Sequence, residues 1–127
     1  MRLSAKLKHL VERELDFIVQ LAEEGVRKGG ATGRTEESQF RNLQNIASVT
    51  DSTLVLKNFI GYQMGRKYID EKVGRQILED IETLERKAAE IAAKEGFKES
   101  NEFRTFRMEL VRLYLGFFVR ALKATRV

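Results

Sequence analysis

The side chains that most often perform catalysis or bind metals are scarce in this 127-residue sequence. Cysteine is absent, which excludes thiolate nucleophiles, disulfides and cysteine-based zinc sites. His9 is the single histidine, and the sequence implies no nucleophile or orienting carboxylate beside it. Two carboxylate pairs, Glu79 with Asp80 and Glu82 with Glu85, occur in an acidic segment without a histidine partner. We interpret them as a solvated face and predict a protein that is not an enzyme and uses no cofactor or metal.

A glycine-rich segment, residues 29–35, resembles a phosphate-binding loop in composition. The motif itself is not satisfied, because Lys28 occupies the first glycine position and Arg34 replaces the lysine that reaches the β- and γ-phosphates. No strand precedes the segment either. We predict instead a flexible basic loop over about residues 25–35, with Gly25 ending the first helix. Such a loop would present its cations to nucleic acid as a mobile arm.

The elements that must position these residues are helical. Apolar residues recur every three or four positions along most of the chain, which is the spacing of one helical face. The pattern predicts five helices, over about residues 4–24, 36–47, 51–66, 70–94 and 100–123. The connections are short and no segment alternates as a strand does. The fold class that we predict is all-α, a small five-helix bundle forming a single domain over residues 1–127.

The composition excludes a membrane-spanning protein. Apolar residues make up 43% of the chain and charged residues 33%. No apolar run reaches the roughly 18 residues that a spanning helix requires, and no signal-peptide pattern opens the sequence. We expect a cytoplasmic protein with no membrane partner.

The positive charge is small in total but unevenly distributed, with a formal net charge of +4 at pH 7. Residues 68–99 contain nine acidic and six basic side chains, whereas residues 100–127 contain two acidic and six basic ones. A row of Arg and Lys on the last helix can bind a phosphate backbone and release its counterions. The same cations also fit a solvated face, or a face paired with the acidic fourth helix, and the sequence leaves these interpretations open.

A helix-turn-helix arrangement is the second interpretation of this basic chain. The second and third predicted helices, joined by residues 48–51, would form it, and the third would enter the DNA major groove. Four side chains would be available there for base readout: Lys57, Asn58, Gln63 and Arg66. Gly61 and Gly65 in the same helix predict the close approach of another helix. A homodimeric, helix-turn-helix-like transcriptional regulator is therefore the alternative function.

Three local patterns together resemble the small helical subunit of the type III-A CRISPR effector, the Csm complex. Ser38-Gln39-Phe40-Arg41 is similar to that family's Ser/Thr-Gln-aliphatic-Arg signature. Tyr62-Gln63-Met64-Gly65-Arg66 is similar to its Tyr-x-x-Gly-Arg segment. The last helix carries markers like those of the family's C-terminal helix: Phe103, Phe106, Glu109, Tyr114 and Phe117. The order and spacing of the three patterns match across about residues 36–123.

The resemblance implies a non-catalytic subunit of an antiviral ribonucleoprotein. Members of this family are small helical bundles that stack in several copies beside the subunits holding the guide RNA, and help to bind target RNA paired to that guide. Arg41 and Arg66, at matching motif positions, are the implied RNA contacts. Charge alone adds seven candidates: Lys57, Lys67, Arg34, Arg104, Arg112, Arg120 and Lys123. The expected partners are guide and target RNA, other effector subunits and further copies of this chain, with phosphates bound independently of sequence.

Overall fold

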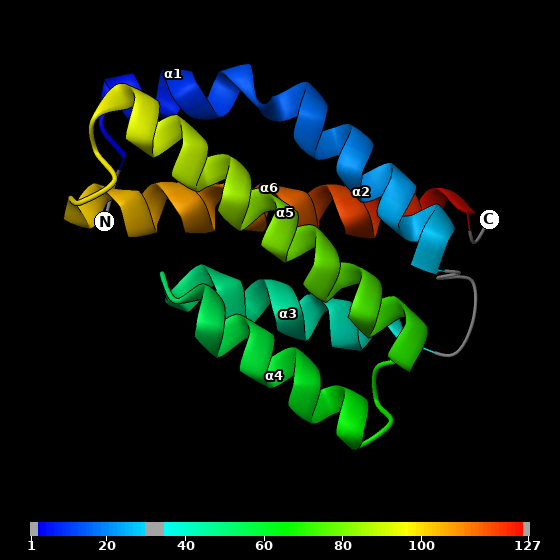
Figure 1. Cartoon of the computed structure of the whole chain (residues 1–127). Helices are drawn as coiled ribbons and strands as arrows, with labels where there is room; N and C mark the ends of the chain where they lie inside the picture. The colour runs from blue at the N-terminus through cyan, green and yellow to red at the C-terminus, as the bar shows by residue number, and fades with distance from the viewer. Residues whose placement is uncertain (1–2, 30–34, 126–127) are drawn as a thin grey trace.

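The computed structural model describes residues 3–29 and 35–125, whose regular structure is entirely helical (Figure 1). The helices are α1 (Ala5–Arg13), α2 (Leu15–Gly29), α3 (Glu37–Val49), α4 (Thr53–Gly65), α5 (Glu71–Glu95) and α6 (Asn101–Thr125). The predicted all-α class is confirmed. The predicted count of five is wrong, because these residues form six helices and the first predicted helix is in fact two, α1 and α2.

The break between α1 and α2 occurs at Glu14. The Glu14 amide donates to the Val11 carbonyl at 2.9 Å, one residue short of the usual helical partner. The Glu14 carboxylate forms an ion pair with Lys87 of α5, at 3.5 Å. Neither glycine nor proline marks this position. The break therefore depends on tertiary packing, which the helical periodicity of the sequence does not contain.

Helix α6 is the centre of the fold and packs against α1, α2, α3 and α5. In Figure 1 it lies behind α2 and α5. Its buried residues are Thr105, Phe106, Met108, Leu110, Val111, Tyr114, Leu115, Phe118 and Leu122. The Phe118 ring lies 5.7 Å from the Phe40 ring and 5.8 Å from the Tyr114 ring, at the distances of favourable aromatic pairs. The exposed residues of α6 are consequently confined to its two ends within the described part.

A buried polar cluster crosses the core between α5 and α6. Asp80 is 3% exposed and accepts hydrogen bonds from the Tyr114 hydroxyl at 2.6 Å and from Gln76 Nε2 at 3.0 Å. Burial raises the pKa of Asp80 above its usual value, although both hydrogen bonds act in the opposite direction. Burial also raises the pKa of Tyr114 well above its usual range, and the neighbouring carboxylate adds to this effect. Asp80 is therefore part of the core and not of the solvated acidic face that the sequence predicts.

The predicted flexible loop over residues 25–35 is wrong in its first part. Residues 25–29 are the last turn and a half of α2, and Gly25 and Gly29 are buried. Gly25 is required by packing, because a Cβ there would collide with the Asp80 carboxylate and crowd the Tyr114 hydroxyl. Residues 30–34, including Arg34, lie outside the described residues.

The remaining helix ends follow local chemistry. Gly96 adopts a left-handed conformation (φ 81°) and ends α5. Ser52 caps α4 by accepting the Val55 amide at 3.1 Å. The start of α5 is capped from outside, since the Asp70 amide donates to the Thr35 hydroxyl at 2.8 Å.

Two glycines inside helices should respond to alanine in opposite directions. We expect Gly25→Ala to lower the free energy of unfolding by about 1–3 kcal/mol, because the added methyl overpacks the Asp80 cluster. Gly116→Ala should raise it by about 0.5–1 kcal/mol, because nothing lies within 4 Å of the added Cβ and alanine favours the helix. Urea unfolding followed by circular dichroism measures both. A stabilising Gly25→Ala would show that α2 does not approach Asp80 as described.

The buried Asp80 should make stability fall as pH rises. Its carboxyl titrates above the usual value of 3.8 when folded, so the native state holds the proton longer than the unfolded chain does. The stability that the buried Asp80 carboxyl contributes is fully present below pH 3.8 and is lost as the pH rises through its raised pKa. The free energy of unfolding of Asp80→Asn, minus that of the parent, should therefore increase from acid to neutral pH. Glu82→Gln, at an exposed position of the same helix, is the control, and an equal pH-dependence for it would contradict the assignment.

Candidate nucleic-acid interface

Helices α3 and α4 form an antiparallel hairpin on one side of the bundle, seen below α5 and α6 in Figure 1. Three residues join the end of α3 to the start of α4. At the opposite end of the hairpin, Gln63 Nε2 donates to Gln39 Oε1 at 2.8 Å, and Gln63 is only 5% exposed. This hydrogen bond connects the two segments, 38–41 and 62–66, on which the family resemblance rests. Residues far apart in sequence are thereby held in one place.

Arg66 lies at the end of this hairpin between two tyrosines, and we call Tyr62, Arg66 and Tyr68 the aromatic clamp. The guanidinium carbon is 5.2 Å from the centre of the Tyr62 ring and 4.5 Å from that of Tyr68. Its terminal nitrogens donate to the two tyrosine hydroxyls at 3.4 and 3.2 Å. Within the described residues no carboxylate pairs with Arg66. The clamp therefore presents a positioned, uncompensated positive charge to solvent.

The outer face of α4 is largely apolar, although no other helix of the described residues covers it. Leu54 and Val55 are 72% and 50% exposed, and Val49 just before the hairpin turn is 81% exposed. Gly61 and Gly65 have nothing within 4 Å of an added Cβ, so the predicted close approach of another helix does not occur within the described chain. Several large apolar side chains exposed near one another in this way are typical of an interaction surface.

Lys57 is held between α4 and α5 and does not lie free on the surface of the hairpin. Its ammonium bonds the Glu85 carboxylate of α5 at 2.9 Å, and the Thr53 hydroxyl donates to the same carboxylate at 2.6 Å. Partial burial by itself raises the pKa of Glu85, but the hydrogen bonds from Thr53 and Lys57 outweigh it and lower the pKa below its usual value. Lys57 thus attaches α4 to α5.

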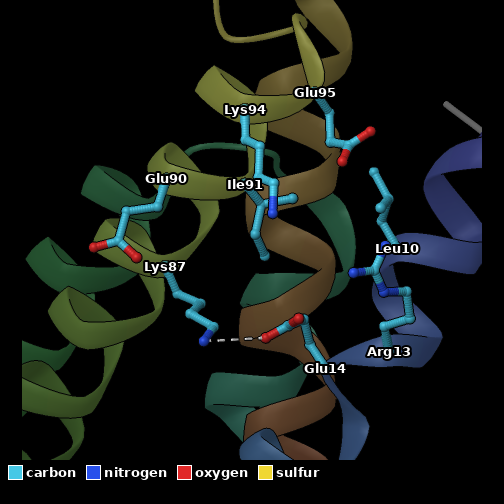
Figure 2. A pocket seen from close by; sticks show the side chains of 8 residues that line it. All are labelled: Leu10, Arg13, Glu14, Lys87, Glu90, Ile91, Lys94 and Glu95. Atoms are coloured by element: carbon cyan, nitrogen blue, oxygen red, sulfur yellow. Dashed lines mark ion pairs between the residues drawn. The ribbon is translucent and has the colours of Figure 1, made fainter.

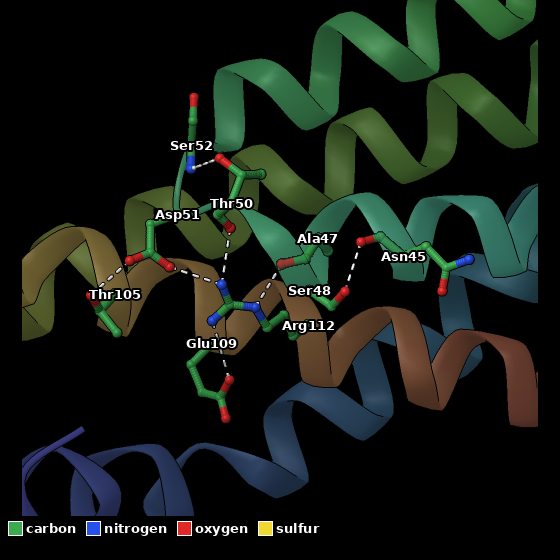
Figure 3. A network of polar contacts seen from close by, with 9 residues as sticks. All are labelled: Asn45, Ala47, Ser48, Thr50, Asp51, Ser52, Thr105, Glu109 and Arg112. Atoms are coloured by element: carbon green, nitrogen blue, oxygen red, sulfur yellow. Dashed lines mark hydrogen bonds and ion pairs between the residues drawn. The ribbon is translucent and has the colours of Figure 1, made fainter. Parts of the chain in front are cut away.

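Arg112 is likewise held by hydrogen bonds within the protein (Figure 3). Its guanidinium donates to the Ala47 carbonyl at 2.7 Å, to the Thr50 carbonyl at 2.9 Å and to Asp51 at 2.8 Å. A second carboxylate, Glu109, lies 3.6 Å away. Arg112 therefore fastens α6 to the carbonyls at the end of α3, and this engagement leaves it little capacity to bind a phosphate.

Asp51 completes the network around Arg112. Partial burial alone raises the pKa of Asp51, but hydrogen bonds from Arg112 and from the Thr105 hydroxyl, at 2.9 Å, outweigh it. The pKa of Asp51 is consequently below its usual value, and the pair stays ionised over the neutral range.

The other predicted cations are exposed but do not form one row. Arg41 lies on α3, and Lys67 follows Arg66 in the turn after α4. Arg104 lies at the start of α6, while Arg120 and Lys123 lie near its end. Arg104 and Arg120 are separated by about 24 Å along the axis of α6, given a rise of about 1.5 Å per residue. The cationic last helix thus carries its exposed charge at two separate ends.

A cavity of about 210 Å³ lies between α1 and α5 (Figure 2). Leu10 and Ile91 provide its apolar wall. Three cations and three carboxylates line the rest: Arg13, Lys87, Lys94, Glu14, Glu90 and Glu95. These charges balance, and no nucleophile or histidine accompanies them. In the described parts of the chain, no cluster of three His, Cys, Asp or Glu residues could hold a metal ion, and no helix is long and apolar enough to cross a membrane.

Comparison with protein-family models, curated proteins and solved structures found no match to this chain.

The sequence motifs contain Tyr62 and Arg66 but not Tyr68, whose part in the clamp depends on the turn after α4. The signal available in the sequence was the four-residue spacing of Tyr62 and Arg66, which brings both side chains to one helical face.

Arg112 and Arg104 provide a matched test of which cations are structural. We expect Arg112→Ala to lower the free energy of unfolding by about 2–3 kcal/mol, because charged hydrogen bonds to two carbonyls and Asp51 are lost together. Arg104→Ala should change it by less than about 0.5 kcal/mol, as exposed substitutions usually do. Denaturant unfolding measures both. Equal stabilities of the two variants would contradict the structural role of Arg112.

Proposed function

We propose that this protein is the non-catalytic small subunit of a type III-A CRISPR (Csm) ribonucleoprotein effector. Several copies stack within the complex and help to bind target RNA paired to guide RNA in antiviral defence. The contacts are made to phosphates and do not depend on sequence, because base pairing to the guide identifies the target.

The observation that carries this proposal is the hydrogen bond between Gln39 and Gln63. The first two motif segments of the resemblance are separated along the chain, and they meet at this contact in one helical hairpin. Each segment ends in an exposed arginine, Arg41 or Arg66, and neither arginine has an ion-pair partner among the described residues. Unpaired arginines lose no internal ion pair when they bind phosphate.

Two further features support membership in a multi-subunit particle. The largely apolar outer face of α4 gives neighbouring subunits or copies a surface to cover, and Asn58 and the Tyr62 hydroxyl are its exposed polar groups among the described residues. The exposed cations at the two ends of α6 lie about 24 Å apart along the helix axis. This distance is longer than a small ligand and suits the extended phosphate backbone of a nucleic acid. Lys67 adds a charge beside Arg66.

The alternative regulator is less well supported by the geometry. Helix-turn-helix motifs cross at roughly 90–120°, whereas α3 and α4 run antiparallel, with contacts at both ends of the hairpin. The face of α4 that would enter a groove is mostly apolar, and Lys57 and Gln63, counted for base readout, are held by Glu85 and Gln39.

The test is a pull-down of the tagged full-length protein from its host at mild salt, with mass spectrometry of bound proteins and nuclease analysis of bound nucleic acid. We expect a large particle with several unlike subunits and a short RNA of defined length. Recovery of a lone dimer without RNA would contradict the proposal and favour the regulator.

The double charge reversal Arg41→Glu with Arg66→Glu tests the assigned contacts in the same preparation. The variant should keep its helical circular dichroism, because both side chains are exposed. Purified particles carrying it should bind target RNA at least tenfold more weakly, as expected when several phosphate contacts are lost and reversed, with a shallower salt dependence than the parent. Arg86→Glu with Lys94→Glu, on exposed positions of α5 for which the structure gives no ion pair, is the matched control and should bind RNA like the parent. Equal RNA affinity of parent and first variant would exclude Arg41 and Arg66 as the contacts.

A further inference from the structure

Tyr62 and Tyr68 are the most exposed aromatic side chains in the described residues, at 57% and 47%. The remaining aromatic residues are buried or partly buried against the core. Two exposed rings that surround one arginine combine flat apolar surface with positive charge. Surfaces that bind single-stranded nucleic acid use this combination, since bases stack on the rings while phosphates meet the cation.

The turn that carries Tyr68 is fixed by backbone contacts. Lys67 has a φ of 65°, in the left-handed region. The amides of Tyr68 and Ile69 both donate to the Gln63 carbonyl, at 2.9 and 3.3 Å. Because the Gln63 side chain is itself bonded to Gln39, the turn is anchored to both helices of the hairpin. The aromatic clamp is therefore preorganised, which lowers the entropic cost of binding a ligand.

A cavity of about 280 Å³ lies directly beside the clamp. Met64, Lys67, Tyr68, Ile69, Asp70 and Glu71 line it. Tyr68 thus belongs to both the clamp and the cavity. Met64 and Ile69 add apolar surface, and Lys67 adds a cation. The carboxylates of Asp70 and Glu71 add hydrogen-bond acceptors.

We propose that the aromatic clamp and this cavity bind one unpaired nucleotide of an RNA strand, an inference that rests on the proposed function. The phosphate binds Arg66 and Lys67, and the base stacks on Tyr68 within the cavity. Carboxylate oxygens of Asp70 and Glu71 accept hydrogen bonds from base amino groups or ribose hydroxyls. A base inside a duplex has both faces covered by its neighbours, so the site selects unpaired nucleotides. It adds base stacking to the phosphate contacts made elsewhere.

The test measures binding of the full-length chain to three fluorescent probes: a short oligoadenylate, a strand of equal length with abasic riboses, and the corresponding RNA duplex. The parent should bind the oligoadenylate most tightly. Tyr68→Leu should weaken that binding about tenfold, within the range of base–aromatic stacking. It should weaken binding of the abasic strand by no more than about twofold, because Arg66 keeps its contacts with the ring and hydroxyl of Tyr62. Tyr68→Phe keeps the ring and should bind like the parent. Arg86→Ala, which removes an exposed cation from α5, should change each affinity by less than about twofold.

The outcomes separate this inference from the proposed function. Equal binding of the three probes, unchanged by Tyr68→Leu, overturns the nucleotide site and leaves phosphate binding by Arg41 and Arg66 intact. Absence of any RNA binding by the parent also overturns it, and the pull-down then decides the proposed function separately. Circular dichroism of each variant shows that its helices are retained.

Discussion

The enclosure of α6 by four other helices is the constraint on which the rest of the structure depends. Once α1, α2, α3 and α5 pack around it, no residue between positions 105 and 119 of α6 is more than partly exposed, and buried polar groups there must find partners inside the protein. Asp80 and Tyr114 satisfy one another, and Gly25 supplies the space that their contact needs. Helix α4 lies outside this arrangement and packs mainly on α3 and α5. The hairpin of α3 and α4 therefore has outer surface that the rest of the bundle does not cover.

The same constraint separates cations that hold the fold from cations that are available to a ligand. Arg112 lies where α6 passes the end of α3, and its donors are taken up by the carbonyls and carboxylates at that junction. Arg66 lies at the end of the peripheral hairpin, and among the described residues its guanidinium meets the rings and hydroxyls of two tyrosines. Both residues are arginines on helices or at their ends, and both add equally to the net charge. Their difference comes from the number of helices around them, which is why charge counts along the sequence do not distinguish a structural arginine from a binding one.

Particular residues show how far the sequence could be interpreted. The end of α5 was predictable because Gly96 and the apolar stripe before it act locally. The break at Glu14 was not, since no glycine or proline marks it and the Glu14 amide bonds the Val11 carbonyl only in the folded structure. Gly25 was misassigned for a related reason: glycine ends helices and also permits close packing, and only the position of Asp80 decides between these roles.

The motif residues Gln39 and Gln63 were visible as separate patterns, but their hydrogen bond appears only when the hairpin is formed. Tyr68 was absent from the predicted site because the turn that directs it has no periodicity.

Helix α4 contains a conflict between local sequence and the isolated fold. It is apolar on nearly all sides, as a helix buried on all sides would be, yet Leu54 and Val55 face solvent. A chain selected to act alone would gain solubility from polar residues at such positions, and the neighbouring α5 shows this, with charged residues along its outer side. The conflict disappears if α4 is covered in an assembly and the clamp at its end meets RNA. One short helix would then provide both a protein contact and a nucleic-acid contact, which places neighbouring copies and the RNA backbone in a fixed relation to each other.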